Sequence, residues 1–107
     1  MSLIKEFIKK TISENTVTIF SKSYCPYCLG AKDIFDDLKV DYKALELNEL
    51  PDGLDIQQGL AELTSQRTVP NIFVNQVHVG GSDDLKAALA SGKLAILLKE
   101  AGIKNKL

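Results

Sequence analysis

The chain of 107 residues has two cysteines, Cys25 and Cys28, which lie three positions apart in the segment SKSYCPYCLGAK. Two thiols at this spacing can hold a metal ion, form a structural disulfide or carry out thiol–disulfide exchange. A zinc site needs three or four protein ligands, and outside the pair there is no cysteine and one histidine, His78. A structural disulfide here would close a very short loop and stabilise little. We therefore interpret the pair as redox-active and expect no metal.

Cys25 is the better candidate for the attacking thiol. Exchange requires a thiolate, and an ordinary cysteine, with a pKa of about 8.5, is only slightly ionised at neutral pH. Pro26 suits the first turn of a helix, so free N–H groups and partial positive charge are expected beside Cys25, with Lys22 just upstream. Cys28 lies one turn further, where packing covers it. We expect Cys25 to be the nucleophile and Cys28 the resolving thiol.

Alternating helical and strand patterns surround the cysteines and predict an α/β fold with one parallel strand pair and an antiparallel edge. A hairpin is expected at Asn75-Gln76, and Ser82 is expected to cap the helix that follows it. His78 alternates with valines on the second hairpin strand and is expected to face solvent. The predicted helices span residues 1–15, 26–39, 54–66, 82–91 and 92–102, and the predicted strands span 16–20, 41–47, 70–74 and 77–81.

The composition is that of an ordinary globular protein, with 45% hydrophobic and 25% charged residues. Thirteen basic and fourteen acidic residues give a formal charge of −1, which provides no overall attraction for nucleic acid or an anionic membrane. The amphipathic first segment contains two glutamates and no arginine, which favours a domain helix over a transit peptide. We expect one domain over residues 1–107, located in the cytoplasm.

With CPYC between a strand and a helix, QRTVPNIFVN at residues 66–75 and GGSDDL at residues 80–85, the chain resembles a glutaredoxin of the dithiol, CPYC type. The likeness covers essentially the whole chain. Thioredoxins are related in fold but typically carry a tryptophan before the first cysteine, and this chain has no tryptophan. The resemblance implies a thioredoxin-like fold, with a four-stranded mixed sheet flanked by about five helices, and reduction by glutathione.

The resemblance also implies roles for residues near the cysteines. Lys22 and Gln66 would contact the glycine carboxylate of glutathione, and Tyr27 would flank its sulfur. A cis proline, Pro70, would present the backbone of Val69 to the cysteine residue of glutathione, with Thr68 at the start of that segment. Taken alone, a threonine and a valine before a proline are simply extended.

The GGSDD segment would receive the γ-glutamyl end of glutathione. Gly81 permits close approach, the helix that begins near Ser82 offers N–H groups to the carboxylate, and Asp83 or Asp84 would pair with the amine. Asp84 aligns better with the typical aspartate of the family. Ordinary helix capping with acids in the first turn explains the same residues without any ligand.

The resemblance implies a glutathione-dependent oxidoreductase that reduces protein disulfides and protein–glutathione mixed disulfides. Expected partners are glutathione, such proteins and, indirectly, glutathione reductase, and the chain is expected to be a monomer. One alternative is a glutaredoxin dimer that holds a [2Fe–2S] cluster, which Pro26 disfavours because cluster-binding relatives usually have serine or glycine there. Another is a thioredoxin that is reduced by an NADPH-dependent flavoprotein.

Overall fold

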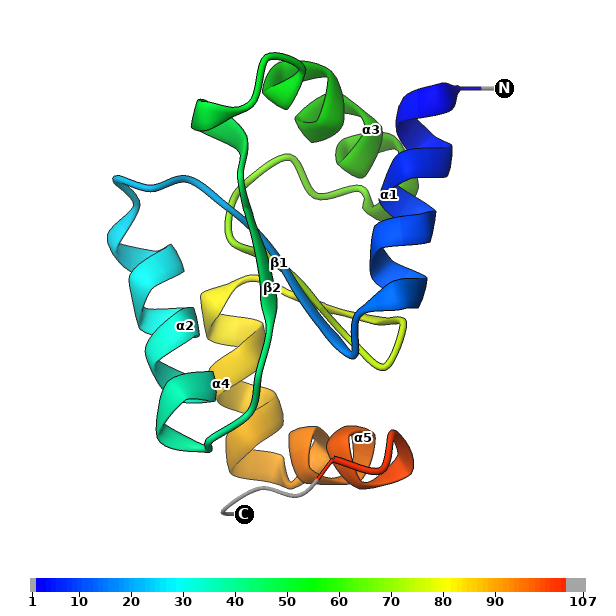
Figure 1. The fold of residues 1–107 in the computed structure, drawn as a ribbon. Helices are drawn as coiled ribbons and strands as arrows, with labels where there is room; N and C mark the ends of the chain where they lie inside the picture. Colours follow the sequence, from blue (N-terminus) through cyan, green and yellow to red (C-terminus); the bar gives the residue numbers. More distant parts are fainter. Residues whose placement is uncertain (1, 104–107) are drawn as a thin grey trace.

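A four-stranded mixed sheet forms the centre of the structure, a computed structural model that describes residues 2–103 (Figure 1). Met1 and residues 104–107, which the expected domain includes, lie outside the described residues. The elements are α1 (Leu3–Glu14), β1 (Val17–Ser21), α2 (Pro26–Asp37), β2 (Lys43–Glu46), the short 3-10 helix η1 (Leu47–Glu49), α3 (Gly53–Thr64), β3 (Asn71–Val74), β4 (Val77–Gly80), α4 (Ser82–Ser91) and α5 (Lys93–Glu100).

The strands lie in the order β2-β1-β3-β4. β1 pairs with β2 in parallel, whereas β1 with β3 and β3 with β4 are antiparallel. The hairpin between β3 and β4 turns at Asn75 and Gln76, whose φ angles of 51° and 63° match the left-handed turn that suits a twisted hairpin. This arrangement confirms the predicted thioredoxin-like fold, with five helices around a mixed sheet.

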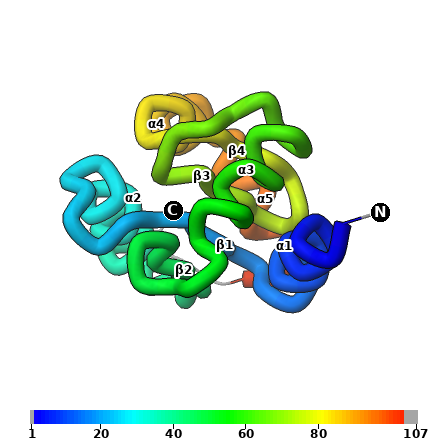
Figure 2. Tube along the Cα trace, turned by 90° about the horizontal axis from the view of Figure 1, so that it is seen from above, coloured from blue at the N-terminus to red at the C-terminus, as the bar shows by residue number. Residues whose placement is uncertain are grey.

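Helices cover both faces of the sheet because the strand side chains alternate in direction. Ile19 and Ile72 pack on the face covered by α2, α4 and α5. Phe20 and Phe73 pack on the face covered by α1 and α3, with their rings edge to face at 5.9 Å between centroids. Figure 2 shows the two layers on either side of the strands. Each face therefore has its own apolar core.

Element boundaries differ from the predictions where local geometry intervenes. The strand expected at residues 41–47 is shorter, Lys43–Glu46, because η1 begins at Leu47. The helix expected to reach residue 66 ends at Thr64, since Ser65 adopts a left-handed φ of 64°. The cap of α4 is Gly81 and not Ser82, which is the first helical residue and is buried.

None of the helices within residues 2–103 is long and apolar enough to cross a membrane.

Candidate active site

Cys25 is the N-cap residue of α2, with extended backbone angles of φ −89° and ψ 115°. Pro26 occupies the first turn, where a missing N–H costs the helix nothing. The backbone N–H of Cys28 donates to Cys25 Sγ at 3.3 Å, as an N-cap side chain requires. Both cysteines are free thiols, and Cys25 is partly exposed. The N–H of the first turn is thus placed to stabilise negative charge on the Cys25 sulfur.

Cys28 lies one turn into α2 and is completely buried. Burial raises the pKa of the Cys28 thiol above its usual value, and a hydrogen bond with the Cys25 side chain raises it further. Hydrogen bonds with the Lys22 backbone and the Ser21 side chain act in the opposite direction. The two thiols therefore have different environments, and their division into an attacking and a resolving cysteine stays a prediction.

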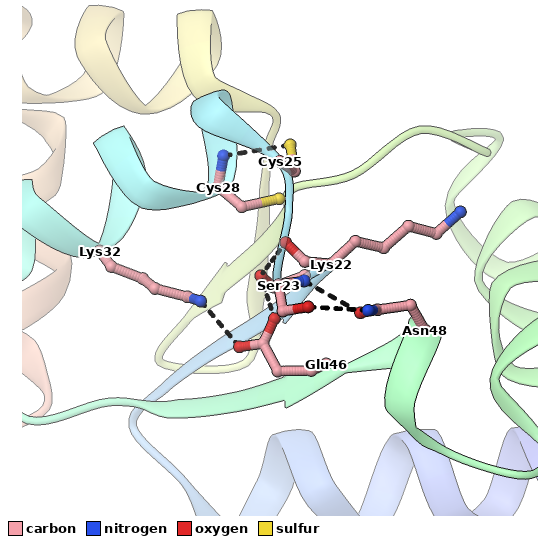
Figure 3. Close-up of polar contacts among 8 residues, drawn as sticks. Lys22, Ser23, Cys25, Cys28, Lys32, Glu46 and Asn48 are labelled. Atoms are coloured by element: carbon pink, nitrogen blue, oxygen red, sulfur yellow. Dashed lines mark hydrogen bonds and ion pairs between the residues drawn. The ribbon is translucent and has the colours of Figure 1, made fainter.

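The loop that carries Cys25 is fixed to η1 by a reciprocal pair of hydrogen bonds (Figure 3). Ser23 N–H donates to Asn48 Oδ1 at 2.9 Å, and Asn48 Nδ2 donates to Ser23 Oγ at 2.7 Å. A backbone bond from Cys25 N–H to the Lys22 carbonyl closes the turn. The position of Cys25 is thereby set by both β1 and the segment after β2.

The segment before β3 reaches the reactive sulfur. The Val69–Pro70 peptide bond is cis, as the resemblance implies. Cys25 Sγ lies 4.0 Å from the carbonyl oxygen of Val69. The N–H of Val69 has no hydrogen-bond partner within the described part of the chain. A main-chain donor and a main-chain acceptor are thus available beside the thiol for an extended peptide.

A pocket of about 550 Å³ lies next to this segment, within the range of small-ligand sites. It brings together all the predicted glutathione-binding residues except Lys22. They are Tyr27, Gln66, Thr68, Val69, Pro70, Gly81, Ser82, Asp83 and Asp84. Three segments far apart in sequence therefore meet at one concave surface.

The α4 end of the pocket combines free N–H groups with carboxylates. Asp84 Oδ2 accepts the Gly81 N–H at 3.0 Å, so this carboxylate caps the helix. Gly80 adopts a φ of 119°, and a Cβ there would collide with the Asp84 carboxylate. Asp83 is exposed, and its carboxylate has no partner among residues 2–103. Asp83 therefore has both carboxylate oxygens free to meet a cationic group, whereas Asp84 has one oxygen engaged in the helix cap.

Gln66 and Lys22 were both predicted to contact the glycine carboxylate of glutathione, but they line two different pockets. Gln66 Nε2 donates to the carbonyls of Thr68 at 3.1 Å and Pro70 at 2.9 Å, which uses both of its hydrogens to brace the loop. Lys22 lines a second pocket, of about 380 Å³, which also contains Gln57. Figure 3 shows the Lys22 side chain extending away from both sulfur atoms.

Gln57 is a candidate binding residue that sequence reasoning missed. Its Nε2 donates to the carbonyl of Arg67 at 2.7 Å, which leaves a second hydrogen of the same amide for a ligand. It lies in the middle of α3, where an amide on a helix surface gives no local signal of function. Only the packing of α3 near the Cys25 loop brings Gln57 to the pocket of Lys22.

His78 lies on β4, exposed as predicted, and its Nε2 is 2.8 Å from Asn71 Oδ1. Burial of part of the ring lowers the pKa of His78. Within the described residues, no group of three or more histidine, cysteine, aspartate or glutamate side chains is arranged to hold a metal ion.

Comparisons with known proteins agree with this geometry. The family model described as Glutaredoxin matches residues 17–79. The chain is 50% identical over 100 residues to Glutaredoxin-C4 of Arabidopsis thaliana, covering 94% of this chain and 74% of that protein. It is 49% identical to a glutaredoxin of Solanum lycopersicum, covering 95% and 93%. The crystal structure of a buckwheat glutaredoxin–glutathione complex matches with a TM-score of 0.92 and 37% identity, covering 95% and 93% of the two chains.

Proposed function

The chain belongs to the glutaredoxin family of thiol–disulfide oxidoreductases, and we propose that it uses glutathione to reduce protein disulfides and protein–glutathione mixed disulfides at its CPYC centre. The observation that carries this proposal is the position of the Cys25 sulfur, next to a pocket that offers main-chain groups at Val69. A peptide disulfide bound there would have its sulfur within reach of Cys25. The complex of the buckwheat relative with glutathione supports the same ligand.

Each end of glutathione has a matching group in this proposal. The free carboxylate of Asp83 and the N–H groups at the start of α4 suit the α-ammonium and the carboxylate of the γ-glutamyl residue. The ammonium of Lys22, with the amide of Gln57, suits the glycine carboxylate. Gln66 holds the loop that presents Val69.

The monothiol cycle uses Cys25. Its thiolate attacks the glutathione sulfur of a glutathionylated protein, the protein sulfur leaves as a thiolate, and Cys25 carries the glutathionyl group. A second glutathione thiolate then attacks the glutathione sulfur of this mixed disulfide. Oxidised glutathione departs and Cys25 returns to its thiolate form, so that two electrons pass to the substrate.

The dithiol cycle reduces a disulfide within a protein and also needs Cys28. Cys25 first forms a mixed disulfide with the substrate, and Cys28 then attacks Cys25. The substrate leaves as a dithiol, and the Cys25–Cys28 disulfide forms. Two glutathiones restore the pair, and NADPH-dependent glutathione reductase recycles the oxidised glutathione. We propose that the chain works as a monomer with one domain, in the cytoplasm, where glutathione keeps thiols reduced.

The test is turnover of a glutathionylated protein with NADPH and either glutathione plus glutathione reductase or thioredoxin reductase alone. We expect turnover only with glutathione present. Turnover with thioredoxin reductase and no glutathione would refute the proposal. Subcellular fractionation tests the compartment, and light scattering tests the monomer.

A further inference from the structure

The pocket that contains Lys22 and Gln57 has an apolar wall, to which the proposed function gives no role. Its volume is about 380 Å³, and the wall is formed by Leu50, Pro51 and Leu54. Leu54 is 81% exposed in the first turn of α3 and does not belong to the buried side of that helix. Single exposed leucines are common on protein surfaces, but several apolar residues around one pocket indicate a binding surface. The wall therefore offers an apolar contact beside the two groups proposed for the glycine carboxylate.

Backbone contacts hold this wall in place. The N–H of Gly53 donates to the carbonyl of Leu50 at 3.1 Å, which closes the turn between η1 and α3. A Cβ at position 53 would collide with the carbonyl of Leu47, so the turn packs directly on η1. η1 is in turn hydrogen-bonded to the loop before Cys25 (Figure 3). The wall and this loop are therefore fixed relative to each other, which lowers the cost of ordering them when a ligand binds.

Glutathione would leave this wall largely uncovered. Its last residue is glycine, which would place a carboxylate beside Lys22 and Gln57 but has no side chain to contact an apolar surface. A larger aliphatic residue at the same position would keep the carboxylate at Lys22 and also cover Leu50 and Leu54. Tyr24 lines the same pocket and adds further apolar surface for such a side chain.

We propose that this pocket selects peptide thiols by the residue that follows their cysteine, and that it prefers a branched aliphatic residue to glycine. The inference rests on the proposed function, because it takes the cysteine of the ligand to lie at Cys25 and the carboxylate to lie at Lys22. The ligand class is a peptide disulfide whose reacting cysteine is followed by a carboxyl-terminal residue such as leucine. Leu54 is then a specificity-determining residue and takes no part in the chemical steps.

The test is a competition for Cys25 between γ-glutamyl-cysteinyl-leucine and glutathione, which differ only in the last residue. The full chain with Cys28→Ser is first converted to its glutathione mixed disulfide by oxidised glutathione, which releases one glutathione thiolate. Both tripeptide thiols are then added in equal, large excess. The thiolate of the leucine peptide attacks the Cys25 sulfur, a new S–S bond forms, and glutathione leaves with the electron pair of the broken bond. Mass spectrometry of the protein gives the equilibrium ratio of the two adducts.

We expect the leucine adduct to exceed the glutathione adduct about three- to tenfold, because the open pocket covers only part of the added side chain. The same exchange on the chain unfolded in guanidinium chloride gives the baseline, which should be a ratio of about one because the reacting thiols are alike. Leu54→Ala should bring the ratio of the folded chain to within about twofold of this baseline. Leu3→Ala is the matched control and should leave the ratio unchanged, since Leu3 is 82% exposed on α1 and does not line the pocket.

A ratio on the folded chain equal to the baseline would overturn the proposal. A preference for leucine that survives Leu54→Ala, or that Leu3→Ala removes equally, would also overturn it. Equal amounts of the two adducts would leave the proposed function standing, because glutathione would still react at Cys25. Absence of both adducts on the folded chain would refute the proposed function, and this inference with it.

Discussion

Cys25 and Cys28 lie one helical turn apart, yet they belong to different parts of the molecule. Cys25 is at the surface end of α2, beside a pocket lined by loops and by the start of α4. Cys28, in contrast, is completely buried. The Cys25 sulfur is therefore accessible to a ligand in the pocket, whereas the Cys28 sulfur is shielded from solvent. One CxxC motif therefore contains two unequal reactive groups.

Removing each sulfur in turn gives the largest contrast. We expect Cys25→Ser to lower deglutathionylation by at least about 100-fold, because the nucleophile is lost. Cys28→Ser should stay within about threefold of wild type, because the monothiol cycle does not use Cys28. A coupled glutathione reductase assay measures both. Substantial activity in Cys25→Ser would reverse the assignment.

A substitution at Gly80 should distort the pocket beside Cys25 and should not alter the packing around Cys28. Because an alanine there combines a left-handed φ with a clash against Asp84, we expect Gly80→Ala to lower the free energy of unfolding by about 1–3 kcal/mol. Glutathione binding should weaken as well. Gly30→Ala is the control, since its Cβ would meet no atom within 4 Å and alanine favours a helix. Chemical denaturation of the two variants tests this, and equal stability would contradict it.

The charge of Lys22 should affect the binding of glutathione near Cys25 and not the reaction of Cys28. We expect Lys22→Met to raise the KM for glutathione about tenfold with little change in kcat, because a charge-assisted contact with a carboxylate is lost. Lys9→Met, at an exposed position of α1, should change neither value. Resolution by Cys28 should also be unaffected, since the Lys22 ammonium points away from the sulfurs. An unchanged KM would remove Lys22 from the binding site.

The burial of Cys28 should make the free energy of unfolding depend on pH in the alkaline range. The pKa of Cys28 is raised in the folded state. As the pH rises, Cys28 therefore loses its proton in the unfolded chain at a lower pH than in the folded chain. The free energy of unfolding should then fall above the pKa of an ordinary thiol, by at most about 1.4 kcal/mol per pH unit, because one proton is involved. Cys28→Ser should lack this component. Identical pH slopes for wild type and Cys28→Ser, measured by urea titration, would argue against the shift.

The sequence predicted the features that depend on local pattern. The strand–loop–helix around Cys25 and the hairpin at Asn75-Gln76 follow from residue types whose backbone preferences are strong. The cis bond before Pro70 was implied only by the resemblance to glutaredoxins, because a proline by itself favours the trans form. Contacts between elements that are distant in the sequence could not be predicted, because no local pattern of residues indicates them. The pairing of Ser21 with Glu46 follows from the parallel register of β1 and β2, and the proximity of Gln57 to Lys22 from the packing of α3.

The cap of α4 shows a different limit. Ser82 has the residue type of a cap, and yet Asp84 satisfies the Gly81 N–H and leaves Ser82 to pack inside. The sequence GGSDD is compatible with a helix that is capped by Ser82 and with one that begins after Gly81 and is capped by the Asp84 carboxylate. Only the three-dimensional path of Gly80 and Gly81 decides between them.

The proposed binding of a peptide to main-chain atoms of Val69 has an evolutionary consequence. A ligand that pairs with a backbone N–H and C=O does not depend on the identity of the side chain they belong to. Position 69 can therefore drift among β-branched residues without loss of peptide recognition. New ligand preferences would instead arise by exchange of charges at positions 22 and 83, which makes these two sites the natural starting points for directed evolution of an altered substrate range.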